Sequence, residues 1–295
     1  MNGVIVIDKP AGLTSHDVVN RVRRILGQRS VGHLGTLDPS ATGVLPVVLG
    51  NLTRLAQFYA HSEKTYEGVI RFGFATDTYD ADGEPTTPPQ DVHINYDEVR
   101  ALAAQFRGII EQMPPPFSAK KIAGVPAYKL ARKNKEVALK PVQVEIKEFE
   151  ILDTSGDQAT FRARVASGTY IRSVAHDMGQ QLGCGAHLAS LCRTSAAEFA
   201  IADAHSLQTL EAASQQGTVE SLFVHPRMLV PQFPSVSATE ESAALIRTGR
   251  AVNLPEMSRA PKVKVFYGQR DLIAIATRIA GTLFHPGIVF AGPAD

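Results

Sequence analysis

The stretch His33-Leu-Gly-Thr-Leu-Asp-Pro-Ser-Ala-Thr-Gly43 is the most informative part of the chain. It places a single carboxylate, Asp38, among small residues, and its glycines allow the backbone to approach a ligand closely. An aspartate held against an electrophile can act as a nucleophile or a base. The same pattern also fits an ordinary turn, because Asp-Pro is a common turn signal. Since no Gly-Lys-Ser/Thr follows the glycines, the stretch is not a phosphate-binding P-loop.

Strands and helices are expected on both sides of this stretch, without a strict strand–helix–strand repeat. Residues 4–7 form an apolar run typical of a strand, and the apolar stripe of residues 14–26 predicts a helix that ends at Gly27. Further strands are expected at residues 44–49, 65–74, 142–152 and 161–165, further helices at 96–106 and 169–182, and loops at 28–43 and 75–92. This mixture favours the α+β class.

The composition is that of an ordinary globular protein, with 44% hydrophobic and 20% charged residues among 295. No stretch is apolar and long enough to cross a bilayer, and the apolar N-terminal run lacks the basic segment that precedes a signal-peptide core. The two cysteines, Cys184 and Cys192, do not make a disulfide framework. We therefore expect a cytoplasmic protein without membrane attachment.

Two charged segments are hidden by the net charge of +1. Residues 118–140 contain seven lysines and arginines and one glutamate, whereas residues 77–98 contain seven acids and no lysine or arginine. A polyanion needs a local basic surface, not a basic protein, so the first segment is a candidate for binding nucleic acid. A solvated surface explains the same run equally simply.

A second unit is expected to begin near Pro234. Residues 230–234 contain two prolines and few charges, as linkers often do. Beyond them the pattern predicts a short helix at 238–247 and strands at 263–266, 272–276 and 288–290. The sequence thus divides into residues 1–233 and residues 234–295, and the second part is small enough to depend on contact with the first.

Six motifs follow one another along the chain. They are Lys9-Pro-Ala-Gly-Leu-Thr-Ser15, Gly32-His-Leu-Gly-Thr-Leu-Asp-Pro-Ser-Ala-Thr-Gly-Val-Leu-Pro46, Lys64-Thr-Tyr66, Thr76-Asp-Thr-Tyr-Asp-Ala-Asp-Gly83, Gly168-Thr-Tyr-Ile-Arg172 and Gly183-Cys-Gly-Ala-His187. In this order they resemble the TruB-type tRNA pseudouridine-55 synthases, over most of residues 3–200. The resemblance implies a pseudouridine-synthase fold with a mixed central sheet and flanking helices. A looser likeness of residues 272–276 and 283–290 implies a small, mostly-β PUA-like RNA-binding domain.

The resemblance implies a reaction and a substrate. The reaction is the isomerisation of uridine 55 in the T-loop of tRNA to pseudouridine, by base flipping and by re-forming the glycosidic bond through C5. The basic insertion of residues 113–141, with Lys129 and Arg132, is expected to clamp the T-arm. We expect a monomer that uses no metal or organic cofactor. One departure is Ser30, where the family often has a lysine, so a phosphate contact of that lysine is not implied here.

The resemblance also assigns roles to individual residues. Asp38 matches the essential aspartate, Arg172 matches the arginine that pairs with it, and Tyr66 matches the tyrosine that stacks on the target base and takes the C5 proton. The other matches are expected to bind the substrate or shape its pocket, and they are His33, Tyr170, Leu191, Lys9 and Pro10. Plainer explanations exist, namely a surface ion pair for Arg172 and ordinary core packing for Tyr66 and Leu191.

Other interpretations stay open. The same fold could act mainly as an RNA chaperone, or as a guide-RNA-dependent synthase, a type that usually carries a larger C-terminal domain and extra N-terminal residues. A metal-dependent phosphotransferase would need further carboxylates near Asp38, and none is adjacent in sequence. The spacing of Cys184 and His187 fits no standard zinc finger. The pattern that begins at Asp80 departs from a calcium loop at its later ligand positions.

Overall fold

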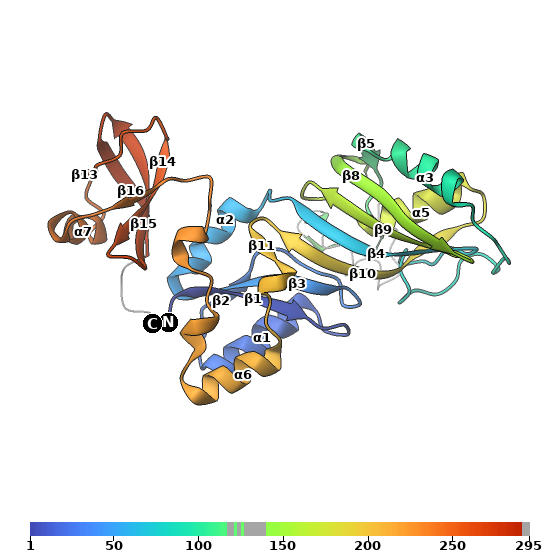
Figure 1. The fold of residues 1–295 in the computed structure, drawn as a ribbon, viewed down its shortest axis with the longest axis horizontal. Helices are drawn as coiled ribbons and strands as arrows, with labels where there is room; N and C mark the ends of the chain where they lie inside the picture. Colours follow the sequence, from blue (N-terminus) through green and yellow to red (C-terminus); the bar gives the residue numbers. More distant parts are fainter. Residues whose placement is uncertain (117–120, 123–124, 127–139, 291–295) are drawn as a thin grey trace.

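The computed structural model describes residues 1–116, 121–122, 125–126 and 140–290, and its larger part is built on one mixed sheet (Figure 1). The strand order is β1-β3-β10-β4-β9-β8-β5, with β2 beside β3 and β11 beside β10. These strands are β1 (Gly3–Lys9), β2 (Val31–His33), β3 (Thr42–Leu49), β4 (Lys64–Phe72), β5 (Gly108–Gln112), β8 (Val142–Ser155), β9 (Gln158–Val165), β10 (Ala186–Ala196) and β11 (Phe199–Ala200). The β10–β3 pair is parallel and the others are antiparallel. The expected mixed sheet is confirmed.

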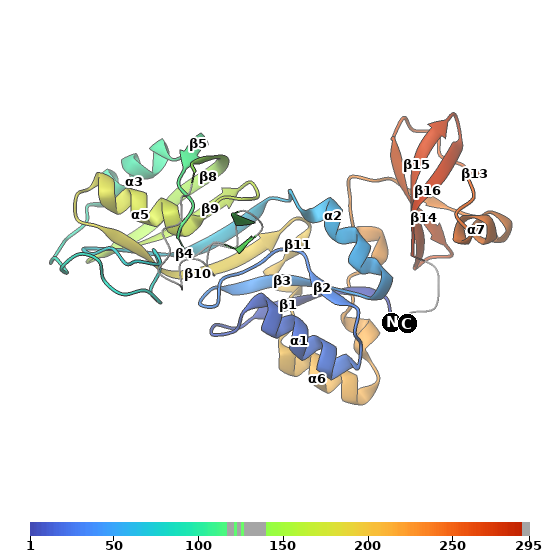
Figure 2. The ribbon, with the colours of Figure 1, turned by 180° about the vertical axis from the view of Figure 1, so that it is seen from behind.

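Helices cover the two halves of this sheet separately. Helices α1 (Ser15–Leu26) and α6 (Leu207–Gln216) lie together beside the half that contains β1 and β3, whereas α3 (Tyr96–Gln105) and α5 (Ile171–Gln181) lie against the other half (Figures 1 and 2). The start of α1 is fixed by a capping box, in which Thr14 Oγ1 accepts from the Asp17 amide at 3.0 Å. Gly27 ends α1 in the left-handed conformation, as predicted.

Strand β10 joins the two halves, because it pairs with β3 on one side and β4 on the other. Gly43 faces Arg193 across the β3–β10 pair, and a Cβ built at Gly43 would lie 2.3 Å from the Arg193 carbonyl oxygen. The φ of Gly43 is +95°, a conformation that side chains disfavour. Only glycine therefore allows this approach, which brings the end of the Asp38 loop beside β10.

A five-stranded sheet forms the C-terminal unit. It has the order β12-β14-β15-β16-β13 and carries one helix. Its elements are β12 (Ser235–Ser237), α7 (Glu240–Arg247), β13 (Val252–Asn253), β14 (Lys262–Tyr267), β15 (Asp271–Ala280) and β16 (Leu283–Val289). Phe266 and Phe290 pack with Leu229 in an apolar cluster that reaches the first sheet. The expected small, mostly-β unit is thus present, and it packs against the rest of the chain through this cluster.

Short elements complete the connections. They are α2 (Ala56–Tyr59), the 3₁₀ turns Gly50–Leu55, Ile201–Asp203, Val219–Leu222 and Pro226–Met228, and the paired strands β6 (Lys121–Ile122) and β7 (Val125–Pro126). Two expectations need correction. The loop predicted at 28–43 contains β2, because Val31, Gly32 and His33 extend the sheet along β3. The loop predicted on the surface at 75–92 is partly buried, because Thr76 and Asp80 are only 2% and 7% exposed.

Candidate active site

Asp38 and Arg172 form a two-point ion pair at the centre of the candidate site. Arg172 Nε lies 3.0 Å from Asp38 Oδ2, and Arg172 Nη2 donates to Asp38 Oδ1 at 3.2 Å. Such a fork fixes the plane of the carboxylate as well as its position. The Arg172 side chain is 6% exposed and the Asp38 side chain 39%. The arginine is thus part of the buried frame, while the carboxylate remains open to a ligand.

Arg172 contacts a second carboxylate that the sequence analysis did not assign. Arg172 Nη1 lies 3.4 Å from Asp80 Oδ2 and donates to the Thr78 carbonyl oxygen at 3.1 Å. The Thr78 hydroxyl donates to Asp80 Oδ1 at 2.5 Å. Burial raises the pKa of Asp80, and the Thr78 hydroxyl and Arg172 act in the opposite direction. Asp80 therefore contacts Nη1, the guanidinium nitrogen that Asp38 does not contact.

Side chains from three other elements hydrogen-bond to the backbone on both sides of Asp38. The Ser15 hydroxyl bonds both backbone groups of Leu37, at 2.8 Å to its amide and 3.1 Å to its carbonyl. Lys9 Nζ donates to the Pro39 carbonyl at 3.0 Å, and burial lowers the pKa of Lys9 to about 8. Arg193 donates to the carbonyls of Gly35 and Thr36 at 3.0 and 3.3 Å. The loop is thus preorganised before any substrate arrives.

A pocket of about 430 Å³ opens beside the Asp38–Arg172 pair. This volume lies within the usual range of small-molecule sites. Its walls come from the Asp38 loop, the entrance to β4, the turn before α5 and strand β10. The lining residues with side chains that matter below are Asp38, His61, Lys64, Tyr66, Tyr170, Arg172 and Leu191. Burial lowers the pKa of Lys64 to about 8, so this ammonium has lost much of its water.

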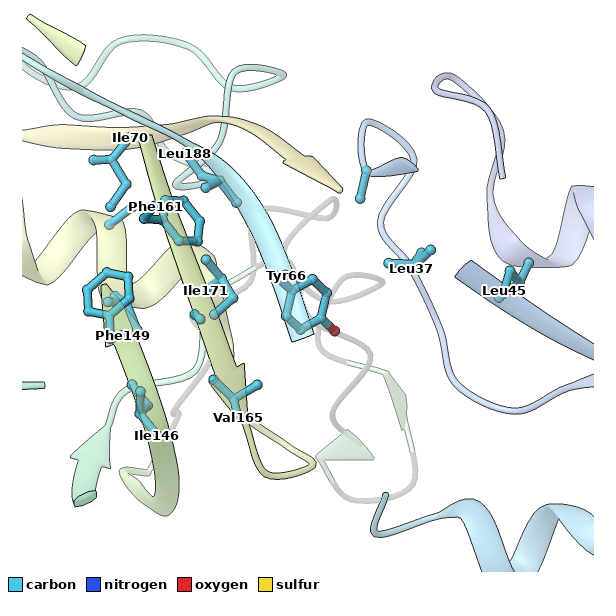
Figure 3. Packing of buried hydrophobic residues seen from close by; sticks show 14 of the residues in the cluster. Leu37, Leu45, Tyr66, Ile70, Ile146, Phe149, Phe161, Val165, Ile171 and Leu188 are labelled. Carbon is cyan, nitrogen blue, oxygen red and sulfur yellow. The ribbon is translucent and has the colours of Figure 1, made fainter. Parts of the chain in front are cut away.

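Tyr66 lies between this pocket and the hydrophobic core. Its residue is 8% exposed, and its ring packs in the cluster that also contains Leu37 and Ile171. Figure 3 shows the hydroxyl directed away from Ile171 and Val165, on the side where Leu37 lies. Burial raises the pKa of the Tyr66 hydroxyl, and the adjacent Arg193 guanidinium acts in the opposite direction. Tyr66 is thus both a core residue and a pocket residue.

The structure brings five of the ten predicted site residues together at one pocket. Tyr170 and Leu191 line the pocket with Asp38. Lys9 and His33 do not line the pocket. Lys9 Nζ donates to the Pro39 carbonyl, next to Asp38 in sequence. The His33 ring accepts from the Gly35 amide at 3.2 Å. Pro10 is exposed, and its carbonyl accepts from Lys9 Nζ at 2.9 Å. The two predicted clamp residues, Lys129 and Arg132, lie outside the described residues.

Asp80 and Arg193 are charged residues at the site that sequence reasoning did not assign to it, as are the pocket-lining His61 and Lys64. Asp80 lies in a quoted motif, but its carboxylate looked like part of an exposed acidic segment. Arg193 follows Leu191 by two residues and is 0% exposed, which no local pattern indicates. The one available indication was a single arginine within a strand of mostly uncharged residues. Charged residues are rarely buried unless they are paired, so such an arginine is a candidate for a buried contact.

Among the described residues, no group of three or more histidine, cysteine or acidic side chains could hold a metal ion. Both cysteines are free thiols. No helix in the described part of the chain is long and apolar enough to span a bilayer.

Comparisons with known proteins give one answer for the family. The model of the TruB family pseudouridylate synthase N-terminal domain matches residues 23–171, and that of the tRNA pseudouridylate synthase B C-terminal domain matches residues 172–231. The tRNA pseudouridine synthase B of Solibacter usitatus is 48% identical over 98% of this chain and 100% of its own length. This chain belongs to the TruB family. The family resemblance seen in the motifs, and with it the expectation of an isomerase, is confirmed.

Further TruB relatives extend this result. The tRNA pseudouridine synthase B of Dehalococcoides mccartyi is 40% identical over 99% of this chain and 98% of its own length. Among solved structures, a chain of a Cbf5–Nop10–Gar1 complex superposes with a TM-score of 0.72 at 25% identity, covering 98% of this chain and 85% of that chain. The fold is therefore shared with a protein whose sequence has diverged widely from this chain.

The contact between Asp80 and Arg172 can be tested in this TruB chain. Asp80→Asn is expected to slow single-turnover product formation by between about tenfold and a hundredfold, since small misplacements of a reacting group cost that much. Substrate affinity should stay within about threefold, because Asp80 lies behind the arginine and away from the pocket mouth. Asp82→Asn is the matched control, since Asp82 is exposed and lies two residues away. Equal rates for the two variants would contradict a role for Asp80.

Proposed function

We propose that this protein isomerises uridine 55 in the T-loop of tRNA to pseudouridine, acting as a monomer in the cytoplasm. The observation that carries the proposal is the Asp38–Arg172 pair at the wall of a nucleoside-sized pocket that Tyr66 and Leu191 also line. A folded T-loop does not expose the glycosidic bond, so the target nucleotide must leave its stack, at a cost of about a few kcal/mol. The relatives' names support tRNA as the substrate.

The reaction requires the base to detach from C1′, rotate and rejoin through C5. Asp38 is placed to begin it, either by attack on C1′ or by removal of a proton at C2′, and the two routes remain alternatives. Arg172 orients the carboxylate through its two contacts. Because no oxidation state changes in the isomerisation, the chemistry needs no redox cofactor.

The apolar walls have a part in the same scheme. The detached base must stay near the sugar, and water must stay away from C1′, or the sugar would be hydrolysed. Leu191 and the ring of Tyr66 supply such walls, and Tyr170 closes the side of the pocket at the start of α5. The Tyr170 backbone is fixed by Gln112, which accepts from its amide at 2.8 Å and donates to its carbonyl at 3.0 Å. Tyr66 is the proposed acceptor of the C5 proton, and His33 is proposed to fill the space that the flipped uridine leaves in the RNA.

Binding of the T-arm is proposed to need surfaces beyond the pocket. The insertion of residues 113–141 supplies cations by composition, and the proposed PUA-like domain of residues 234–295 contacts the rest of the chain where Phe266 and Phe290 pack with Leu229. Lys64 at the pocket adds a cation whose pKa is lowered by burial to about 8, and a nearby phosphate would raise this pKa toward its ordinary value.

The basic insertion gives a salt-dependence prediction. Replacing Lys129, Arg132 and Lys133 together by Ala should weaken tRNA binding and flatten its dependence on salt. Each lost phosphate contact removes roughly one unit from the slope of log K against log salt. Filter binding over a series of salt concentrations measures this slope, and the Asp38→Asn variant serves as a control with intact cations. An unchanged slope would mean that the run is only a solvated surface.

A guide-RNA-dependent synthase is the second candidate, favoured by the fold likeness to a chain of the Cbf5–Nop10–Gar1 complex. The full-length identity of 48% to a tRNA pseudouridine synthase B supports the first candidate more strongly. Mass mapping of pseudouridine in an unmodified tRNA transcript, incubated with the pure protein alone, separates the two. We expect pseudouridine at position 55 without any added RNA or protein. Modification at another position, or only with a guide RNA, would overturn the proposal.

A further inference from the structure

Arg193 is a buried cation for which the proposed function has no role. With Lys9 it is one of the two largest side chains that are fully buried among the described residues, and both flank the Asp38 loop. Its guanidinium donates to the carbonyls of Val44 at 2.7 Å, Gly35 at 3.0 Å and Thr36 at 3.3 Å. Carbonyl oxygens satisfy these donors but carry no full negative charge, so holding a loop does not by itself explain why a cation is kept here.

The Tyr66 hydroxyl faces the same guanidinium. Tyr66 and Arg193 are direct neighbours across the antiparallel β4–β10 pair, and the guanidinium lies near enough to the phenol to act against the burial that raises its pKa. Arginine has five N–H donors and no acceptor, so the group that it presents to the Tyr66 oxygen is a donor with a positive charge. The Tyr66 side chain therefore presents its oxygen to a fixed positive charge at the edge of the pocket.

We propose that Arg193 is a positioning residue for the C5 proton transfer, aiming the Tyr66 oxygen at the rotated base and stabilising its phenolate form. The inference rests on the proposed function, because it supplies a charge partner for the proton acceptor of that reaction. Arg193 also holds the Gly35 and Thr36 carbonyls. One side chain thus fixes the distance between the loop that carries Asp38 and the strand that carries Tyr66.

The proposed step balances without another reactant. After the base has rejoined the sugar through C5, the C5–H bond breaks and the proton moves to the Tyr66 phenolate oxygen. The electron pair left at C5 forms the double bond between C5 and C6, the double bond between C6 and N1 becomes a single bond, and N1 takes up a proton from solvent. Tyr66 ends the step as a neutral phenol and later returns its proton to solvent, while Arg193 stays protonated throughout.

The charges around Tyr66 determine how this step depends on pH. The groups that face Tyr66 from the packed elements are Asp38 on the loop, Arg193 on β10, Arg172 and Tyr170 at α5, and His61 and Lys64 at the start of β4. Burial and Asp38 raise the pKa of Tyr66, and Arg193 lowers it. Loss of the guanidinium should therefore shift the rise of the reaction rate with pH to higher pH, because less phenolate is present at a given pH.

Release of tritium from a T-arm stem-loop with [5-³H]uridine at the target position tests the proposal. Arg193→Lys keeps a positive charge but loses the several N–H donors of the guanidinium. Lys9→Met is the matched control, since Lys9 is an equally buried cation that holds the Asp38 loop at the Pro39 carbonyl. Arg193→Lys should slow tritium release at least about tenfold, shift its rise with pH to higher pH and leave stem-loop affinity within about threefold. Lys9→Met is expected to lower the rate at all pH values without shifting its rise with pH.

A double variant keeps the test decisive where the substitution also disturbs packing. If Arg193 acts through Tyr66, then Tyr66→Phe with Arg193→Lys should be no slower than Tyr66→Phe alone. The proposal would be overturned if the rate loss of the double variant equalled the product of the two single losses. It would also be overturned if the rate of Arg193→Lys rose with pH over the same range as that of wild type. Arg193 would then only hold the Asp38 loop in place. If wild type itself releases no tritium from the stem-loop, the proposed function fails and this inference fails with it.

Discussion

Asp38→Asn is expected to lower turnover by at least about a hundredfold, the low end of what one catalytic acid–base group supplies. The amide has nearly the size of the carboxylate but lacks its charge, so it can neither attack C1′ nor remove a proton. Folding should be almost unaffected, because Arg172 keeps Asp80 and the Thr78 carbonyl as partners. Affinity for tRNA should also persist, since Asp38 contributes no cation to the RNA surface.

Two measurements check this expectation together. Tritium release from uridine-labelled tRNA reports turnover, and filter binding reports affinity. Thr36→Ala is a suitable control, because Thr36 is exposed and its backbone carbonyl, which Arg193 holds, is unchanged by the substitution. A residual activity of Asp38→Asn well above a hundredth of wild type would remove Asp38 from the centre of the reaction.

Tyr66→Phe is expected to bind tRNA almost normally and to react roughly 10²- to 10⁴-fold more slowly. Phenylalanine keeps the ring that packs with Leu37 and Ile171 and faces the pocket. It loses only the oxygen that we propose as the acceptor of the C5 proton. The loss should therefore appear in the chemical step, and material should accumulate after the base has rejoined through C5 and before the C5 proton leaves.

Single-turnover kinetics with uridine deuterated at C5 measure this step. A primary isotope effect that grows in Tyr66→Phe is expected, because removal of the C5 proton then limits the rate. Tyr66→Leu provides the comparison that also loses the aromatic face, and its rate should fall further. A wild-type rate for Tyr66→Phe would reduce Tyr66 to a packing residue.

Local patterns predicted much of the fold. The α1 helix carries its own start and stop signals in Thr14 and Gly27, so its limits follow from the sequence. The strands around residues 44–49 and 161–165 follow from apolar runs and alternation, and both are present as β3 and β9. The short strand β2 was not predicted, because it forms through pairing with β3 and has little apolar character of its own.

The site was predictable where a motif carries it and unpredictable where contacts cross the sheet. Asp38 and Arg172 were expected to pair from the family likeness, and they do. Asp80 comes to Arg172 across 92 positions of sequence only because its loop folds back onto β10, where the Ala81 amide donates to the Leu188 carbonyl at 3.0 Å. Arg193 meets Tyr66 through strand register, which a single sequence does not encode locally.

The most direct test of the account is a crystal structure of the Asp38→Asn variant with a uridine-containing T-arm stem-loop. We expect the target uridine to be flipped into the pocket, with its ring against Tyr66 and Leu191. Its C1′ or C2′ should lie within about 3.5 Å of the side chain at position 38, the distance of a near-attack geometry. A uridine that stays stacked in the loop, or that binds away from Arg172, would contradict the account.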